Sequence, residues 1–302
     1  METNGNAAVS RGVSALAILR SLRPKQWTKN FFLYCGLVFS GGLSDAALVG
    51  RVSLGFLAFC LLSGVIYIVN DIQDIEQDRM HPRKRLRPIA SGAISIRGAA
   101  IAAAIFLAVS FAIVLPLGWR FALCALAYFV MNFFYSMGLK HVVIIDVFCV
   151  AMGFVLRAYG GMAIIQAINP ALEITAWFLC CTFFLALFLA ICKRRHEMIS
   201  LAENGESHRR VLSEYSPELI DQMVSATTAS TILSYGLWTA LGKFEQRHMI
   251  YTLPFVVFGV FRYLYLVYRR DGGGEPEQLL LNDAPLLACI VLWLAAVLAL
   301  LS

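Results

Sequence analysis

The sequence predicts an all-α membrane protein with about nine transmembrane helices. Of its 302 residues, 59% are hydrophobic and 15% are charged, whereas a soluble domain is roughly half apolar and a quarter charged. Several apolar stretches reach the ~20 residues that a helix needs to cross the ~30 Å of a hydrocarbon core. Lys and Arg gather in alternate loops between these stretches, as in multi-pass membrane proteins. We therefore expect a membrane-embedded helical bundle.

The apolar segments place the spans in order along the chain. We expect them at about residues 30–48, 50–70, 97–117, 119–138, 142–165, 174–192, 222–241, 249–268 and 285–301. Gly41-Gly42 interrupts the first span, and glycine lowers helix propensity. The preceding stretch 12–22 is short and amphipathic, so we expect it to lie on the membrane surface.

No linker divides the chain, so we expect a single domain over residues 1–302. Its polar parts are an N-terminal segment 1–29, an Asp-rich motif with a basic loop at 71–96, and a loop at 193–221. Of the 25 Lys and Arg residues, 19 lie on the side of the membrane that holds these polar parts and four lie on the other side. The remaining two lie inside predicted spans. The positive-inside rule then places the N-terminus and these loops in the cytoplasm of a plasma-membrane protein. The N-terminus has no small-residue cleavage site, and we expect no signal peptide.

The most informative polar segment is Asn70–Asp78, at the end of the second span. Asn70, Asp74 and Asp78 are spaced i, i+4, i+8 and line one face of a helix. Mg²⁺ is typically held by one or two carboxylates together with substrate phosphates. The sequence therefore predicts a Mg²⁺-polyphosphate site with these three ligands and with Asp71 beside them. The alternative is a solvated acidic helix end, although carboxylates at i and i+4 repel each other unless a cation bridges them.

Two basic segments flank this motif in the sequence. Lys84 and Arg85 lie between Pro82 and Pro88, which give the loop a defined turn, and we expect these cations to contact phosphate. Lys25 and Lys29 are also spaced i, i+4 around Trp27. They either face a phosphate or belong to an interfacial anchor with Trp27 in the aromatic belt.

A third group of candidates lies further along the chain. Asp146 and Arg157 are eleven residues apart, so they lie on nearly the same face of one helix with Gly153 between them. Ionisable residues inside a span are functional candidates, and the alternative is an internal ion pair with other helices. Lys193 and Arg194 end the sixth span, where they contact substrate or form a snorkelling belt. Tyr135 and Lys140 precede Asp146 and complete the list of candidates.

The motif Asn70-Asp71-x-x-Asp74-x-x-x-Asp78 resembles the first Asp-rich motif of the UbiA superfamily of intramembrane prenyltransferases. Further stretches resemble its decaprenyl-phosphate phosphoribosyltransferase branch; they are residues 23–30, 81–90, 138–141, 156–161 and 274–277. The resemblance implies nine helices around a central cavity, open to the cytosol and laterally to lipid, with Mg²⁺ as cofactor. A second Asp run typical of the aromatic prenyltransferases is reduced here to Asp146, which suits a donor with an additional phosphate.

The resemblance implies transfer of 5-phosphoribose from phosphoribosyl pyrophosphate to a polyprenyl phosphate, with inversion at ribose C1 and release of pyrophosphate. Asp74, Asp78, Lys140 and Arg157 would be the catalytic residues. Substrate would also contact Lys25, Lys29, Asn70, Asp71, Lys84, Arg85, Tyr135, Asp146, Lys193 and Arg194. The product would feed cell-wall arabinan synthesis.

Two alternatives stay open at this point. One is an aromatic prenyltransferase that uses a prenyl diphosphate, which shares the metal site. The other is a transporter or lipid-binding protein, although transport sites lie near the midplane between repeats and these candidates cluster at one membrane boundary. We expect no nucleic-acid partner, and the sequence leaves homo-oligomerisation open.

Overall fold

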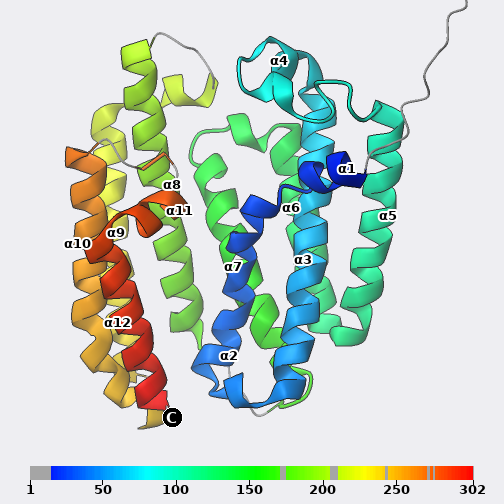
Figure 1. The fold of residues 1–302 in the computed structure, drawn as a ribbon. Helices are drawn as coiled ribbons and strands as arrows, with labels where there is room; N and C mark the ends of the chain where they lie inside the picture. Colours follow the sequence, from blue (N-terminus) through cyan, green and yellow to red (C-terminus); the bar gives the residue numbers. More distant parts are fainter. Residues whose placement is uncertain are drawn as a thin grey trace, which may run out of the picture. The chain divides into compact units, whose positions relative to one another are not determined.

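The described part of the protein consists of helices joined by short loops and turns (Figure 1). The structure is a computed structural model and describes residues 15–170, 175–204, 210–241, 244–270, 273–274 and 276–301. No strand occurs in these ranges. The predicted fold class, all-α, is therefore confirmed. Residues 1–14 of the expected N-terminal segment and 205–209 of the expected loop lie outside the described residues.

The chain forms two compact units, and each is described by itself. The first comprises Met1–Phe31 with Leu54–Pro116, and the second comprises Phe32–Ser53 with Leu117–Ser302. The 3-10 helix η1 (Pro24–Tyr34) and the helix α3 (Ala46–Gln73) each pass along the chain from one unit to the other. That the chain is a single domain, and that its helices surround a central cavity, stay predictions.

The first unit is built around α3. Its other elements are α1 (Ala15–Ser21), α4 (Ile75–Met80), η3 (Lys84–Leu86), α5 (Ile96–Val114) and η4 (Leu115–Leu117). The hydroxyl of Ser110 on α5 donates to the carbonyl of Ala58 on α3 at 2.9 Å. Leu22, just after α1, packs on Gly64 of α3, where an added Cβ would lie 2.4 Å from Leu22 Cδ2. This close approach brings the N-terminal segment onto the helix that carries the acidic motif.

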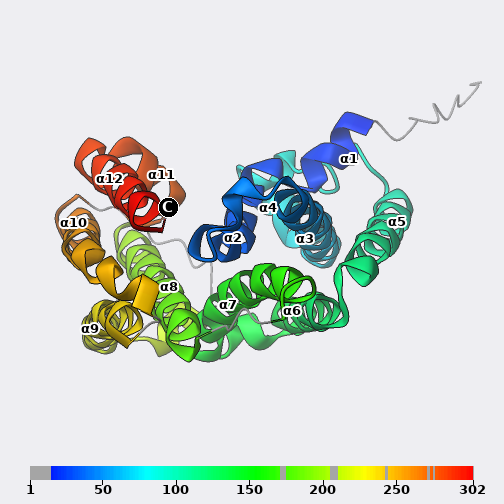
Figure 2. The ribbon, with the colours of Figure 1, turned by 90° about the horizontal axis from the view of Figure 1, so that it is seen from below.

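The second unit is a larger bundle of helices. Its elements are α2 (Cys35–Phe39), η2 (Gly42–Ser44), α6 (Trp119–Met137), η5 (Leu139–His141), α7 (Ile145–Gln166), α8 (Ala176–Asn204), η6 (Arg210–Glu214), α9 (Pro217–Leu241), η7 (Phe244–Thr252), α10 (Leu253–Arg269), α11 (Pro276–Asn282) and α12 (Ala284–Leu301). Helix α8 packs against α7 and α9, and α10 packs against α12 (Figure 2). At Gly161 of α7, an added Cβ would lie 1.9 Å from the carbonyl oxygen of Leu33. Only glycine allows this backbone contact.

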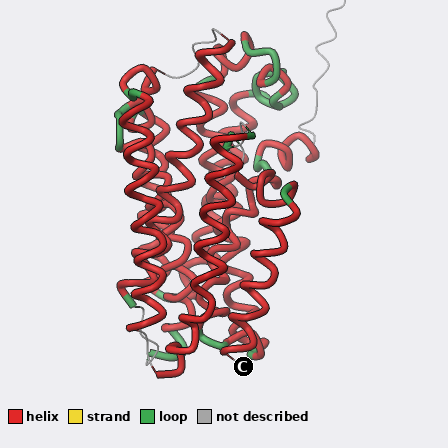
Figure 3. The backbone as a smooth tube through the Cα atoms, turned by 90° about the vertical axis from the view of Figure 1, so that its left-hand side faces the viewer, coloured by secondary structure: helices red, strands yellow, loops and turns green. Residues whose placement is uncertain are grey.

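Seven described helices are long and apolar enough to cross a membrane, and the long helices dominate the tube view in Figure 3. They are Ala46–Gln73, Ile96–Leu117, Trp119–Met137, Ile145–Gln166, Ala176–Ile199, His248–Arg269 and Ala284–Leu301. Each corresponds to one of the nine predicted spans. The predicted span 222–241 is also helical, as part of α9, but its many Ser and Thr residues lower its hydropathy. The count of nine spans stays a prediction.

Two boundaries predicted from hydropathy are wrong. The predicted span 30–48 is not one helix, because Gly41 adopts a left-handed conformation (φ 67°) and separates α2 from η2. The loop predicted from residue 193 begins later, since α8 continues to Asn204. Residues 193–204 contain neither glycine nor proline, so the helix extends beyond the apolar part of its sequence. After the residues outside the described ranges, η6 covers Arg210–Glu214 and α9 begins at Pro217.

Candidate active site

The acidic motif lies where α3 meets α4. Helix α3 ends at Gln73 and α4 begins at Ile75, so Asp74 lies between them with φ −93° and ψ 13°. Backbone hydrogen bonding nevertheless continues through this junction. The N–H of Asp74 donates to the carbonyl of Asn70 at 2.9 Å, and that of Asp78 to the carbonyl of Asp74 at 2.8 Å. The three predicted ligands therefore keep their i, i+4, i+8 register.

Two acidic side chains of this motif are buried and share one arginine. The side chains of Asp71 and Asp78 are 2% and 3% exposed. Nη1 of Arg87 lies 3.1 Å from Asp71 Oδ1 and 2.5 Å from Asp78 Oδ2, and Arg23 makes a further ion pair with Asp71. The side chains of Arg87 and Arg23 are 27% and 28% exposed. The carboxylates are thus inside the unit, while the two guanidinium groups reach its surface.

Arg23 has a backbone conformation that non-glycine residues rarely adopt. Its φ is 51°, and its guanidinium lies 4.7 Å from the ring centroid of Tyr67, one turn before Asp71 on α3. The indole N–H of Trp27 donates to the carbonyl of Leu22 at 3.2 Å and closes the turn around Arg23. The turn therefore holds Arg23 against the acidic motif.

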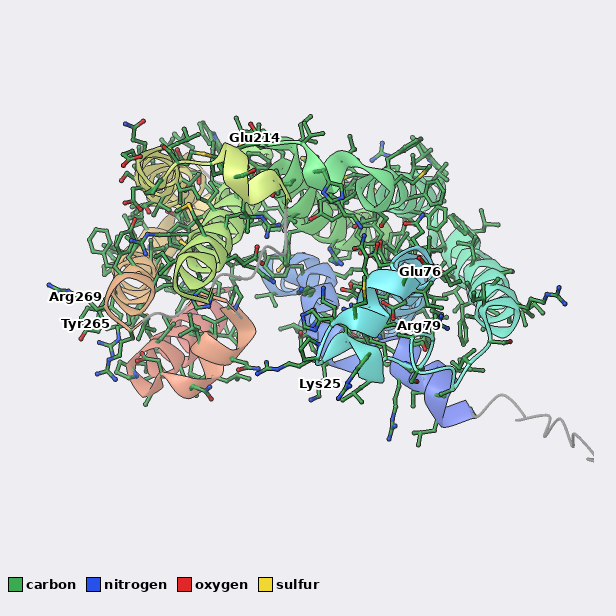
Figure 4. All side chains as sticks on the ribbon, turned by 90° about the horizontal axis from the view of Figure 1, so that it is seen from above. Lys25, Glu76, Arg79, Glu214, Tyr265 and Arg269 are labelled. Carbon is green, nitrogen blue, oxygen red and sulfur yellow. The ribbon has the colours of Figure 1, made fainter. Side chains whose placement is uncertain are left out.

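The predicted phosphate contacts of this unit are surface residues, with Lys25, Lys84 and Arg85 exposed and Lys29 half-buried. The ion pairs with the motif come instead from Arg23 and Arg87. Both belong to the basic segments singled out in the sequence, but spacing alone does not distinguish them from their neighbours. Figure 4 labels Lys25 on η1, and Glu76 and Arg79 on α4. Nε of Arg79 donates to the carbonyl of Ala90 at 3.2 Å and ties α4 to the end of the basic loop.

The oxygen donors of the motif suit a hard divalent cation. Asn70, Asp74 and Asp78 offer one amide and two carboxylates on one face, and Mg²⁺ prefers such oxygen ligands. Within the described ranges, no group of three His, Cys, Asp or Glu residues is arranged to hold a metal.

In the second unit, Arg157 is buried in α7 and 6% exposed. Its Nη1 donates to the carbonyl of Gly153 at 2.9 Å, and its Nη2 donates to the hydroxyl of Tyr128 at 2.7 Å. The guanidinium lies 4.6 Å from the ring centroid of Tyr128 and 5.5 Å from that of Phe154. These contacts orient the cation and include a cation–π attraction. Helix spacing predicted that Arg157 and Gly153 lie on one face, but it gave no indication of Tyr128, which lies on α6.

Asp146 is fully buried, and both of its carboxylate oxygens are bonded within the protein. Oδ1 accepts from the hydroxyl of Tyr215 and Oδ2 from Nε of Arg194, each at 2.7 Å. Arg194 also pairs with Glu197, on the next turn of α8. In the structure Asp146 and Arg194 form an internal ion pair between α7 and α8. Their predicted contacts with substrate stay predictions. Tyr215 carried no signal in the sequence.

Three further candidates lie near this ion pair in the chain. Tyr135 is at the end of α6, Lys140 is in η5, and Lys193 is on α8. All three are half-buried. Their predicted contacts with substrate stay predictions.

Sequence comparison relates most of the chain to one family. The model of the UbiA prenyltransferase family matches residues 30–282. The decaprenyl-phosphate phosphoribosyltransferase of Corynebacterium glutamicum is 32% identical, over 91% of this chain and 84% of that protein. The protein of the same name from Mycobacterium tuberculosis is 30% identical, over 93% of this chain and 92% of its own length.

Solved structures show the same fold. A UbiA homolog from Archaeoglobus fulgidus, bound to GPP and Mg²⁺, superposes with a TM-score of 0.72 at 23% identity. The match covers 94% of this chain and 99% of that chain. The same homolog bound to DMAPP and Mg²⁺ also gives a TM-score of 0.72. At this level of identity the likeness concerns the fold.

Proposed function

Because the chain belongs to the UbiA prenyltransferase family, we propose that it is a multi-pass membrane phosphoribosyltransferase. It would transfer 5-phosphoribose from phosphoribosyl pyrophosphate to a decaprenyl-type polyprenyl phosphate and release pyrophosphate. The observation that carries this proposal is the match, over 91–93% of the chain, to decaprenyl-phosphate phosphoribosyltransferases. The acidic motif and its arginines supply the chemistry that a pyrophosphate donor requires.

Asn70, Asp74 and Asp78 would hold Mg²⁺ on the pyrophosphate of the donor, with Asp71 assisting. Mg²⁺ bound there would offset the charge that builds on the departing pyrophosphate. Arg87 bridges two carboxylates of this motif and is partly exposed. Its guanidinium can therefore turn toward a phosphate while it stays close to the acids.

Arg157 and Lys140 are the proposed cations for phosphates that the metal does not bind. The burial of Arg157 favours this role, because a charge-assisted hydrogen bond is stronger in a low-dielectric environment. The lipid phosphate is already ionised, so the reaction needs no general base. Its oxygen would attack ribose C1 opposite the leaving pyrophosphate, with inversion. Further contacts to anionic groups are proposed for Lys25, Lys29, Lys84, Arg85, Tyr135 and Lys193.

The location follows from the donor and from the charge of the loops. Phosphoribosyl pyrophosphate is a cytosolic metabolite, and most Lys and Arg residues fall on the side of the acidic motif. By the positive-inside rule, we propose a plasma-membrane protein with its N-terminus and acidic motif facing the cytoplasm.

A second candidate function is transfer of a prenyl group to an aromatic acceptor. The observation that favours it is the fold match to homologs solved with GPP or DMAPP and Mg²⁺. This function would use the acidic motif but would not need Arg157 or Lys140 for a sugar phosphate.

The deciding experiment uses purified protein in detergent with Mg²⁺, a polyprenyl phosphate and radiolabelled phosphoribosyl pyrophosphate. We expect label in the organic phase that depends on both the lipid and Mg²⁺ and is lost with excess EDTA. Asp74→Asn serves as the inactive control. If no label is transferred and a prenyl diphosphate is consumed with an aromatic acid instead, the second candidate replaces the first. Full activity in excess EDTA would remove the metal from the proposal.

A further inference from the structure

We propose that Tyr215 is a positioning residue whose hydroxyl fixes the turn before α7 and thereby sets the place of Lys140. The inference rests on the proposed function, in which Lys140 contacts a substrate phosphate. Tyr215 follows η6 and is 69 residues from Asp146 in the chain. It thus ties the segment between α8 and α9 to the start of α7.

The turn before α7 has a strained backbone. Ile144 has φ 70° and ψ −47°, and the N–H of Ile145 donates to the carbonyl of Val143 at 2.8 Å. This is a γ-turn of the rare, positive-φ kind, and a β-branched residue at positive φ is an outlier. Such conformations persist where the surrounding structure imposes them, and they gather at functional sites.

The hydroxyl of Tyr215 supplies a bond that holds this turn. It accepts a hydrogen bond from the N–H of Ile144 at 2.7 Å and donates to Asp146 Oδ1 at 2.7 Å. Tyr215 is 6% exposed and Asp146 is 0% exposed. Burial raises the pKa of the Tyr215 phenol, and the bond to Asp146 raises it further. The phenol therefore keeps its proton and can make both bonds at neutral pH.

Lys140 is connected to this turn through a short run of local hydrogen bonds. The N–H of Val142 donates to the carbonyl of Leu139 at 3.1 Å, and that of Asp146 donates to the carbonyl of Val142 at 3.1 Å. Lys140 therefore lies on a tight segment between the end of α6 and the fixed start of α7. If the hydroxyl of Tyr215 is removed, the N–H of Ile144 loses its acceptor, and the segment can relax from its strained form.

The test compares Tyr215→Phe with Tyr268→Phe. The hydroxyl of Tyr268 also donates to a carboxylate, Asp221, at 2.7 Å, but it lies on α10 and makes no part of the turn. We expect Tyr215→Phe to raise the KM for phosphoribosyl pyrophosphate at least about fivefold with kcat within about twofold. Tyr268→Phe should leave both constants within about twofold of the wild type.

Two further readouts separate positioning from general destabilisation. In a Lys140→Ala background, Tyr215→Phe should raise the KM for phosphoribosyl pyrophosphate by less than about twofold. The effects of residues that act through one another are not additive. Backbone amides of residues 140–146 should exchange hydrogen at least about tenfold faster in Tyr215→Phe and at the wild-type rate in Tyr268→Phe. An undiminished effect in the Lys140→Ala background, or unchanged exchange, would overturn the proposal. If the wild-type protein transfers no phosphoribose, the proposed function fails, while hydrogen exchange still decides whether the hydroxyl holds the turn.

Discussion

Two buried aspartates, Asp71 in the first unit and Asp146 in the second, are both paired with arginine but in different surroundings. The arginines at Asp71 are 27% and 28% exposed, whereas Arg194 at Asp146 is 5% exposed. When a guanidinium at the surface turns away, water replaces its bonds, but the buried carboxylate that it leaves needs another cation, such as Mg²⁺, in its place. When the Asp146–Arg194 pair separates, both of its charges are left buried and uncompensated. The first group is therefore suited to a binding step and the second to holding structure.

Each of these groups also contains a non-glycine residue at positive φ. In the first unit this residue is Arg23 (φ 51°), which is itself a cation of the group, and in the second it is Ile144 (φ 70°), whose backbone bonds to Tyr215. Local strain of this kind is concentrated at functional sites. In one unit the strain orients a charged side chain, and in the other it orients the start of a helix.

The largest expected effect is the loss of activity on Asp78→Asn. Removing a carboxylate that binds the metal should lower kcat/KM about 1,000-fold, equivalent to about 4 kcal/mol of transition-state stabilisation. The measurement is label transfer to lipid at saturating Mg²⁺. Glu76→Gln is the matched control, because Glu76 lies on the same short helix and is exposed (Figure 4). Equal effects of the two substitutions would contradict the special role of Asp78.

Asp146→Asn should mainly lower stability. Removing one partner of a buried ion pair should lower the free energy of unfolding by about 3 kcal/mol. This is the low end of the usual range, because Arg194 keeps Glu197 as a partner. Chemical denaturation in detergent measures the free energy of unfolding. Asp221→Asn is the control, since Asp221 pairs with Arg195 but is 46% exposed, and exposed pairs contribute little. A loss for Asp146→Asn no larger than that of the control would remove the contrast between the two aspartates.

Arg157→Ala tests whether all buried charges of the second unit are structural. We expect kcat/KM for phosphoribosyl pyrophosphate to fall more than tenfold, because a buried charge-assisted contact is usually worth at least ~1.5 kcal/mol. Arg120→Ala is the control, because Arg120 is exposed and bonds to Gln166 on the same unit. A change below twofold in Arg157→Ala would remove Arg157 from the substrate contacts.

The smallest expected effect concerns Asp283, which precedes α12. Hydrogen bonds from Arg262 lower the pKa of the Asp283 carboxyl from its ordinary value of 3.8, and the carboxylate also accepts from the N–H of Leu286 at 2.9 Å. Because the folded pKa is lowered, the stabilisation is present above pH 3.8 and is lost as the pH falls through the folded value. Asp283→Asn keeps a capping side chain. The thermal midpoints of this variant and the wild type should therefore differ slightly at pH 7 and converge only as the pH falls below the lowered pKa of Asp283.

The sequence predicted the helical fold because long apolar stretches have few alternatives in a membrane. It located the acidic motif because its spacing is local, within one stretch of helix. It flagged the interruption at Gly41-Gly42, but it did not predict the junction at Asp74 or the length of α8, because hydropathy does not mark helix ends. The ion pair of Arg23 and the hydrogen bond of Tyr215 were beyond it as well, since their partners are 48 and 69 residues away in the chain. Arg87 is only nine residues from Asp78, but spacing does not distinguish it from Lys84 and Arg85.

Arg87 and Arg23 together balance the two buried carboxylates of Asp71 and Asp78 before any substrate is present. These two carboxylates therefore carry little uncompensated negative charge, and they attract free Mg²⁺ only weakly. We expect an order of addition in which metal and pyrophosphate arrive together, so that the kinetic substrate is the Mg²⁺ complex of the donor. Calorimetric titration with Mg²⁺ alone should accordingly show much weaker binding than titration with Mg²⁺ and pyrophosphate combined.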